Sequence, residues 1–329
     1  RVVALAEELR PHYEAILAAD AGLAPTFFEL ITAAAWLEFR TRQVDVTVLE
    51  TGLGGRLDAT NICSPEVCVI TSIGLDHQEY LGTTLAAIAG EKAGILKPGV
   101  PCVVGQLPAE AEAVVVQRAR EIGAPLYFVR DRFGAALPET NLLGAHQRWN
   151  AGAAWLACEL ATRLPFDAQV AAAALQNITW AGRWQRLTLN DGRALIIDGS
   201  HNEEGIRTIE PLLAALDRPT IVVGALGVDR ARPLVVAAAR HAARLVLVRP
   251  DNERACAVEE LAALVPADFR GEVIRTTVAE LFPAAATCAT QGATVVVLGS
   301  LYLVGEVLAR FEGHAVPTSA WQDRLPLKP

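Results

Sequence analysis

An acidic residue and a histidine follow two apolar, β-branched runs in the first third of the sequence. Glu50 ends the run over residues 44–49, and His77 follows the run over residues 67–72. Because the carboxyl ends of neighbouring parallel strands meet at one sheet edge, both side chains are expected at the same edge. A hard cation such as Mg²⁺ prefers carboxylate oxygens, phosphate and water. A salt bridge explains Glu50 equally well, and a hydrogen bond at a helix start explains His77 equally well.

A glycine-rich stretch separates these two candidates. It contains Gly52, Gly54 and Gly55, and it matches neither the dinucleotide pattern GxGxxG nor the phosphate-binding pattern GxxxxGK[ST], which occurs nowhere in the chain. Its glycines fit a tight backbone turn as readily as a phosphate cradle.

A second polar cluster follows the apolar run over residues 194–197. Asp198 lies at the end of the expected strand. There its carboxylate can accept a hydrogen bond from a ribose hydroxyl or bind a metal-linked water. His201 stands near a helix N-terminus, where it can meet a phosphate. Asn202 is also a good helix cap and Asp198 a good turn residue. The density of polar groups in five residues favours a functional role.

Lys92 lies in a helical stretch of small apolar residues. In apolar surroundings a lysine can lose its proton and react as a neutral amine. A solvated lysine on a helix is the more common situation.

The second half of the chain predicts the scaffold for Asp198 clearly. Short continuous apolar runs alternate with helical patterns, which is typical of a mostly parallel sheet covered on both faces. The expected strands are residues 194–198, 220–224, 244–248, 272–275 and 294–298, and the expected helices are 203–216, 231–242, 256–264, 277–289 and 302–312.

The first half alternates less regularly, as part of an α/β domain. The expected strands are residues 44–50, 67–72, 101–104 and 126–129, and the expected helices are 1–18, 26–42, 84–97, 108–122 and 146–162. The sequence therefore predicts two α/β domains, over residues 1–179 and 180–329, with the boundary near Gly182.

Composition limits the classes of function. The chain has 329 residues, 29 Lys and Arg, 37 Asp and Glu, a net charge of −8 and 52% hydrophobic residues. This excludes a disordered chain and argues against nucleic-acid binding. Six cysteines without a CxxC pair favour buried thiols in the cytoplasm over disulfides or zinc. Residues 281–305 are uncharged, but Pro283 and several Thr and Gly residues favour a short helix and a buried strand over a membrane span.

Taken together, these segments resemble one protein family. The chain resembles the folylpolyglutamate synthase/dihydrofolate synthase family, relatives of the Mur ligases. The matching segments are residues 26–29, 48–61, 70–77, 81–84, 88–95, 144–150, 182–183, 198–202 and 299–306. The stretch Glu-Thr-Gly-Leu-Gly-Gly-Arg-Leu-Asp-Ala-Thr-Asn over residues 50–61 is the most specific.

The resemblance implies a fold and an activity. The fold is a parallel-sheet central domain of the Mur-ligase, P-loop type, followed by a Rossmann-like C-terminal domain. The activity is an ATP-dependent ligation in which a carboxylate becomes an acyl phosphate and the amine of L-glutamate displaces phosphate. The acceptor is dihydropteroate, tetrahydrofolate or another folate, the cation is Mg²⁺, and a cytoplasmic monomer without nucleic-acid or membrane partners is expected.

The resemblance also implies roles for individual residues. Glu50 and His77 match the metal ligands. Lys92 matches a lysine that CO₂ converts to a carbamate, and it counts with His201 as catalytic. The positions that match ATP contacts are Asn150, Arg183 and Asp198, and those that match the pterin-side pocket are Thr26, Phe27, Phe28, Glu29 and Asp58.

One departure from the family lies upstream of Thr26. The family's Gly-Thr-Asn-Gly-Lys-Gly-Ser loop precedes the matching segments, and none of the first 25 residues resembles it. With no Met in the chain, this predicts a fragment or truncated product that is inactive alone. A remnant that binds folate or nucleotide without turnover is the alternative function, and a Mur-type ligase for cell-wall precursors is a third.

Overall fold

The computed structural model describes residues 1–163 and 165–314. Contacts divide the described residues into two units. The first contains Arg1–Gly134 and Leu156–Pro165, and the second contains Ala135–Trp155 and residues 166–314. Helix α7 (Ala145–Leu160) has residues in both. This division is one of contacts, and the domain boundary between residues 179 and 180 stays a prediction.

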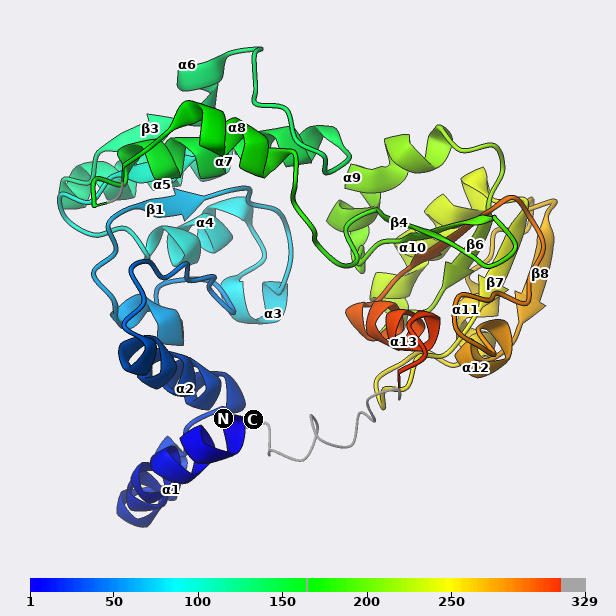
Figure 1. Cartoon of the computed structure of the whole chain (residues 1–329), viewed down its shortest axis with the longest axis horizontal. Coiled ribbons are helices and arrows are strands. Elements are labelled where there is room, and N and C mark those ends of the chain that lie inside the picture. Colours follow the sequence, from blue (N-terminus) through cyan, green and yellow to red (C-terminus); the bar gives the residue numbers. More distant parts are fainter. Residues whose placement is uncertain (164, 315–329) are drawn as a thin grey trace. The chain divides into compact units, whose positions relative to one another are not determined.

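The first unit is built on a small parallel sheet (Figure 1). Strands β1 (Cys68–Ile70), β2 (Cys102–Val104) and β3 (Leu126–Phe128) pair in that order. Helices α4 (Leu85–Ala93) and α5 (Ala109–Ile122) supply Ile88, Ala89, Val115 and others to the core beside the sheet. The other elements are α1 (Val2–Ala19), η1 (Ala21–Leu23), α2 (Phe27–Arg42), η2 (Ala59–Ile62), α3 (Gln78–Leu81) and α6 (Val129–Phe133).

The strand expected over residues 44–50 does not form. These residues pair with no strand in the described part of the chain, and the side chains of Val44, Val46 and Val48 are 43%, 55% and 91% exposed. A β-branched run makes a strand only where a neighbour takes up its backbone hydrogen bonds. The expectation that Glu50 ends a strand is therefore wrong.

The second unit is a three-layer α/β structure. Its six strands follow the order β4-β5-β9-β6-β7-β8, parallel except for β4. The strands are β4 (Gln185–Thr188), β5 (Ala194–Ile197), β6 (Thr220–Val223), β7 (Arg244–Leu247), β8 (Glu272–Arg275) and β9 (Thr294–Leu298). The helices are α8 (Ala168–Leu175), α9 (Glu203–Ala214), α10 (Val228–His241), α11 (Val258–Ala263), α12 (Val278–Leu281) and α13 (Leu301–Phe311).

Alternate residues of the central strands face opposite layers. Ile196 and Ile221 pack in one buried cluster with residues of α9, α10 and α11. Ile197 and Val222 pack in a second cluster with residues of α12 and α13. Burial on both faces explains the continuous apolar runs, since each fully buried Ile or Val contributes about 1.5–3 kcal/mol.

One local expectation about this unit is wrong, and one of its strands has no counterpart among the expected elements. The helix expected over residues 277–289 ends at Leu281. The next residue, Phe282, has φ −120° and ψ 72°, because the proline that follows it disfavours the helical conformation. Strand β4 was not expected, and it adds an antiparallel edge next to β5.

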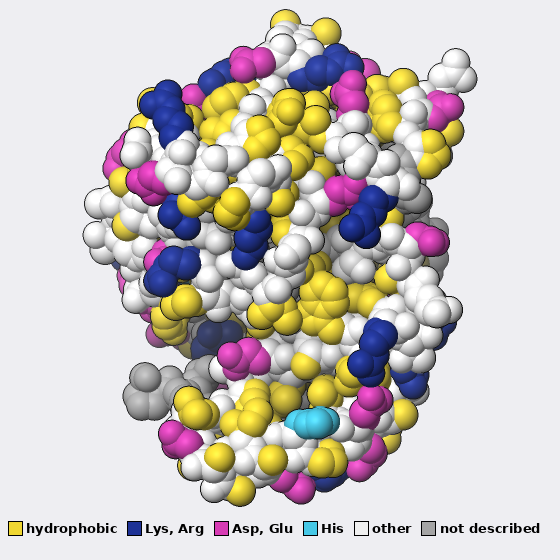
Figure 2. Space-filling model, turned by 90° about the vertical axis from the view of Figure 1, so that its left-hand side faces the viewer, with side chains coloured by type: hydrophobic (Ala, Val, Ile, Leu, Met, Phe, Trp, Pro, Cys, Tyr) yellow, Lys and Arg dark blue, Asp and Glu magenta, His cyan; other side chains and the backbone are white. Residues whose placement is uncertain are grey.

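The described residues show three further features. All six cysteines are free, and Cys158 is exposed rather than buried. No helix among them is long and apolar enough to cross a membrane. On the face shown in Figure 2, basic and acidic side chains alternate among exposed apolar ones.

Candidate functional site

Asp58 organises the glycine-rich loop of the first unit. One carboxylate oxygen accepts hydrogen bonds from the backbone N–H groups of Gly52 (2.8 Å) and Leu53 (2.9 Å). The other accepts from the N–H (2.9 Å) and hydroxyl (2.6 Å) of Thr60. Burial raises the pKa of Asp58, but these four bonds together lower it below its usual value. The ionised carboxylate thus holds the loop closed, and the expectation that it contacts substrate stays a prediction.

The same loop is fixed against the end of α4. The Arg56 N–H donates to the Glu91 carbonyl (2.8 Å), and its guanidinium pairs with the Glu91 carboxylate (3.0 Å). Asn61 Nδ2 donates to the carbonyls of Arg56 and Gly94, both at 3.1 Å. A Cβ atom at Gly94 would lie 2.3 Å from Arg56 Cβ, so only glycine allows this approach.

This packing brings the loop to the helix that carries Lys92. Lys92 is half-buried in the last turn of α4, and its ammonium group forms no hydrogen bond or ion pair among the described residues. A Cβ atom at Gly55 would lie 3.0 Å from the Lys92 carbonyl oxygen. Gly55 therefore allows a close approach to α4, and the tight-turn and phosphate-cradle interpretations of the loop both stay predictions.

The two expected metal ligands are both accessible to solvent. Glu50 is exposed, and the side chain of His77 is 40% exposed. His77 is the N-cap of α3 with a left-handed backbone (φ 51°), and its N–H donates to Asp76 (2.8 Å). Within the described residues, no three or more His, Cys, Asp or Glu side chains form a metal-binding group. The metal-ligand role of Glu50 and His77 stays a prediction.

The residues expected at the pterin-side pocket begin helix α2. Thr26 and Glu29 form a reciprocal cap, in which each side chain accepts from the other residue's N–H. Phe27 is exposed, and the Phe28 ring lies against Gly52, where a Cβ atom would lie 2.6 Å from the ring. The structure thus brings Phe28 to the loop that Asp58 organises.

The expected nucleotide contacts lie in the second unit. Asp198 follows β5 and is only 4% exposed. One of its oxygens accepts from the Trp184 N–H (2.8 Å), and the other accepts from the N–H (2.9 Å) and hydroxyl (2.6 Å) of Ser200. His201 Nδ1 lies 3.0 Å from the Gly199 carbonyl oxygen. Asn202 caps α9 through the Gly205 N–H, as the structural interpretation of this cluster predicts.

Arg183 and Asn150 belong to the same unit as Asp198. Arg183 is exposed, and a Cβ atom at Gly199 would lie 2.9 Å from its Nη1. Asn150 is exposed on α7, where its Nδ2 donates to Gln147 (3.3 Å). Contact of these residues with ATP stays a prediction.

Sequence reasoning left two residues near Asp198 without a role. The first is Trp184, whose N–H donates to that carboxylate. The second is His146, whose Nδ1 is buried without a partner among the described residues. Burial lowers the pKa of His146, while the charge of Asp198 raises it and that of Arg183 lowers it. His146 lies within the segment 144–150, so its motif was visible but its surroundings were not.

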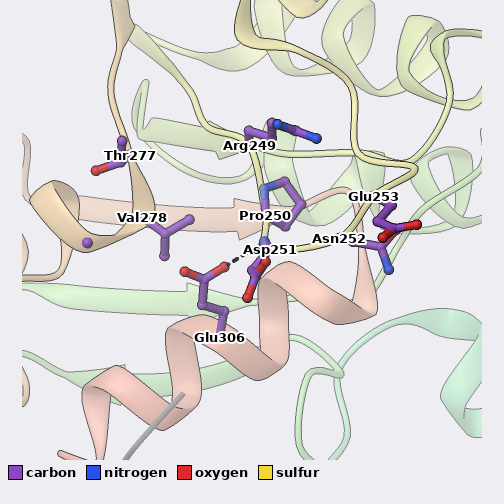
Figure 3. Close-up of a pocket in the computed structure, with 9 residues that line it drawn as sticks. Arg249, Pro250, Asp251, Asn252, Glu253, Thr277, Val278 and Glu306 are labelled. Carbon is purple, nitrogen blue, oxygen red and sulfur yellow. Dashed lines mark hydrogen bonds between the residues drawn. The ribbon is translucent and has the colours of Figure 1, made fainter. Parts of the chain in front are cut away.

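A separate cavity of ≈ 490 Å³ lies beyond the carboxyl ends of β7 and β8 (Figure 3). It is lined by residues 249–253, 277–279 and Glu306. Glu306 accepts from the Asp251 N–H (3.1 Å), and burial raises the pKa of Glu306. The cavity contains none of the site residues expected from the sequence.

The chain is similar to known proteins over the segments that contain several of the candidate site residues. Residues 182–301, which include Arg183, Asp198 and His201, match the family model of the Mur ligase glutamate ligase domain. The chain is 36% identical over 251 residues to a dihydrofolate synthase/folylpolyglutamate synthase of Bacillus subtilis, which covers 68% of this chain and 58% of that protein. A folylpolyglutamate synthase of Lacticaseibacillus casei is 35% identical over 230 residues, covering 62% of this chain and 53% of the relative. The chain thus spans little more than half the length of these relatives.

Two solved folylpolyglutamate synthase structures are similar to this chain in fold. A folylpolyglutamate synthase of Thermotoga maritima has a TM-score of 0.80 and 28% identity, covering 96% of this chain and 77% of that one. A Mycobacterium tuberculosis folylpolyglutamate synthase complexed with ADP and AMPPCP has a TM-score of 0.81 and 25% identity, covering 96% and 79%. Together these comparisons support assignment of the chain to the folylpolyglutamate synthase/dihydrofolate synthase family of the Mur ligase superfamily.

Proposed function

We propose that the chain acts in the ATP-dependent ligation of L-glutamate to dihydropteroate or to reduced folates. In this reaction the γ-phosphoryl group of ATP passes to a carboxylate oxygen of the acceptor, which gives ADP and an acyl phosphate. The amine nitrogen of L-glutamate then attacks the acyl carbon, phosphate leaves and the nitrogen loses a proton. The observation that carries the proposal is that Arg183, Asp198 and His201 all fall inside the matched glutamate ligase segment.

In this proposal, Mg²⁺ would neutralise charge on the nucleotide phosphates. Glu50 and His77 would be its ligands, and their exposure to solvent fits a cation that keeps several waters. The amine of Lys92 has no hydrogen bond or ion pair among the described residues, which fits conversion to a carbamate by CO₂, in which nitrogen bonds to carbon and a proton leaves. The carbamate would add a carboxylate to this region.

The nucleotide contacts in this proposal are Asn150, Arg183 and Asp198. The planar, permanently charged guanidinium of Arg183 suits phosphate oxygens. Thr26, Phe27, Phe28, Glu29 and Asp58 are proposed for the acceptor side, where the Phe28 ring beside Gly52 offers an aromatic surface. The free cysteines favour a reducing compartment, and we propose a cytoplasmic monomer.

The test measures ligand binding by the chain and by Asp198→Ala, with AMPPCP, dihydropteroate and tetrahydrofolate as probes. We expect Asp198→Ala to weaken binding of AMPPCP at least tenfold while both acceptors bind as before, because the variant frees the Trp184 and Ser200 groups beside Arg183. Equal loss for all three probes, or no binding of AMPPCP by the unchanged chain, contradicts the proposal.

A second measurement separates the ligase from the alternative, a binder without turnover. ADP release is followed with ATP, Mg²⁺, bicarbonate, L-glutamate and each acceptor in turn. Release that requires both the acceptor and L-glutamate identifies a ligase. Binding of AMPPCP and acceptor without ADP release identifies the binder. Release that requires a cell-wall precursor instead of a pteroyl acceptor identifies the third function.

A further inference from the structure

The turn over residues 182–184 has an unusual backbone. Gly182 has φ +69°, which glycine adopts readily, but Trp184 has φ +49°. A bulky side chain in the left-handed region is an outlier, and such a conformation costs about 1–3 kcal/mol. Other contacts must therefore hold Trp184 in place.

Those contacts come from the core and from the strand end that carries Asp198. The Trp184 side chain is 4% exposed and belongs to the buried cluster that includes Ile196, Ile206 and Ile209. Its N–H donates to Asp198 (2.8 Å). The Gly199 N–H donates to the Gly182 carbonyl (2.8 Å), so two hydrogen bonds join the turn to residues 198–199.

Arg183 lies between the two left-handed residues and is exposed. Its guanidinium rests over Gly199, where a Cβ atom would lie 2.9 Å from Nη1 and 2.7 Å from a methyl group of Leu301. Because Gly199 follows β5 and carries no side chain, the guanidinium lies at the carboxyl end of this strand. Ligands of open α/β sheets bind at this end of the strands.

We propose that Trp184 is the positioning residue for Arg183: its buried side chain and its bond to Asp198 maintain the left-handed turn that directs the guanidinium toward nucleotide phosphates. The proposal rests on the nucleotide site of the proposed function. It gives Asp198 a second task, since the same carboxylate joins the turn to the end of β5.

The test compares the affinities of AMPPCP and adenosine, because only AMPPCP offers phosphates to Arg183. In Trp184→Gly the left-handed backbone is relaxed but the anchor is lost, so we expect the preference for AMPPCP to fall about tenfold, as a lost charged hydrogen bond predicts. Trp184→Phe keeps an aromatic anchor and is expected to keep most of the preference. Arg186→Ala, which removes an exposed arginine of β4, is the matched control and is expected to keep all of it.

A double-mutant cycle separates positioning from general loss of stability. Arg183→Ala should lower the preference as much as Trp184→Gly, and the two changes together should lower it no further, because both remove one interaction. Additive losses, or an equal loss of adenosine and AMPPCP affinity in Trp184→Gly, overturn the proposal.

Amide hydrogen exchange tests the turn without a ligand. We expect the Gly199 N–H, which bonds Gly182, to exchange faster in Trp184→Gly than in Trp184→Phe. Equal exchange in the two variants shows that Trp184 does not hold the turn and overturns the proposal. If the turn loosens as expected but the unchanged chain binds AMPPCP no better than adenosine, the nucleotide site of the proposed function fails and the direction of Arg183 toward phosphates fails with it.

Discussion

Two aspartates carry out the same structural task in the two units. Asp58 and Asp198 each use both carboxylate oxygens, accepting from backbone N–H groups and from the hydroxyl of the residue two positions later, Thr60 or Ser200. Each carboxylate thereby closes a glycine-containing turn next to candidate site residues.

Removal of the Asp58 charge should open its loop. In Asp58→Asn the carboxamide can no longer accept on both sides, so we expect the amides of Gly52, Leu53 and Thr60 to exchange faster at pH 7, by the equivalent of about 1–3 kcal/mol. The pKa of Asp58 is lowered in the folded chain, so its stabilisation is present above the unfolded pKa and is lost as the pH falls through the folded value. The difference between variant and unchanged chain should shrink below about pH 4. A difference that persists there contradicts this account.

Glu306 should show the opposite pH dependence. Burial raises its pKa, so the folded chain favours the neutral form, and this contribution is lost as the pH rises from the unfolded toward the folded pKa. Glu306→Gln keeps an oxygen acceptor for the Asp251 N–H, and we expect its melting temperature relative to the unchanged chain to rise between pH 4.5 and pH 7.5. Glu253→Gln, an exposed carboxylate of the same cavity (Figure 3), is the control that should show no such change.

At the scale of elements, burial decides what the sequence can predict. The four strands β5, β6, β7 and β9 are covered on both faces, and their continuous apolar runs predict them within a residue or two. The edge strand β8 is mostly exposed. Residues 44–50 show the same β-branched pattern but have no strand partner in the described part of the chain. Strand β4 alternates between half-buried and exposed residues over only four positions, so its pattern is too short to recognise.

The candidate site was predictable in its residue types but not in its contacts. The cluster over residues 198–202 was visible because it follows a predicted strand, and Asn202 does cap α9. The hydrogen bond from the Trp184 N–H to Asp198 was not predictable, because no sequence pattern indicates a tryptophan with positive φ. Likewise, the close approach of Gly94 to Arg56 depends on two segments 38 residues apart, which only the fold brings together.

Two glycines near the end of helix α4 make that approach testable. Gly94→Ala would place its Cβ 2.3 Å from Arg56 Cβ, so we expect destabilisation of the first unit by about 1–3 kcal/mol. Gly90 lies inside the same helix with no atom within 4 Å of an added Cβ, and Gly90→Ala should stabilise by about 0.5–1 kcal/mol. Urea titration followed by the accessibility of the buried Cys102 thiol measures both. Equal effects of the two substitutions would contradict close packing at Gly94.

At the scale of the whole molecule, each unit has its own apolar core. The first unit contains one cluster around β1, β2, α4 and α5, and the second contains a cluster on each face of its six-stranded sheet. Cys68 and Cys102 belong to the core of the first unit, and Cys256 and Cys288 belong to the two clusters of the second. The natural cysteines thus report on both units without any substitution.

Thiol labelling at neutral pH should therefore proceed in an order that the cores dictate. Cys158 is exposed and should react first, followed by the half-buried Cys63. Burial raises the pKa of Cys68 to about 11 and that of Cys102 to about 12, so both lack the reactive thiolate as well as access.

In rising urea we expect Cys68 and Cys102 to become reactive at one shared midpoint, because a single core protects them, and Cys256 and Cys288 to share a midpoint of their own. Labelling of Cys68 in native buffer as fast as Cys158 would contradict its burial. Separate midpoints within either pair would show that the unit concerned does not unfold as one body.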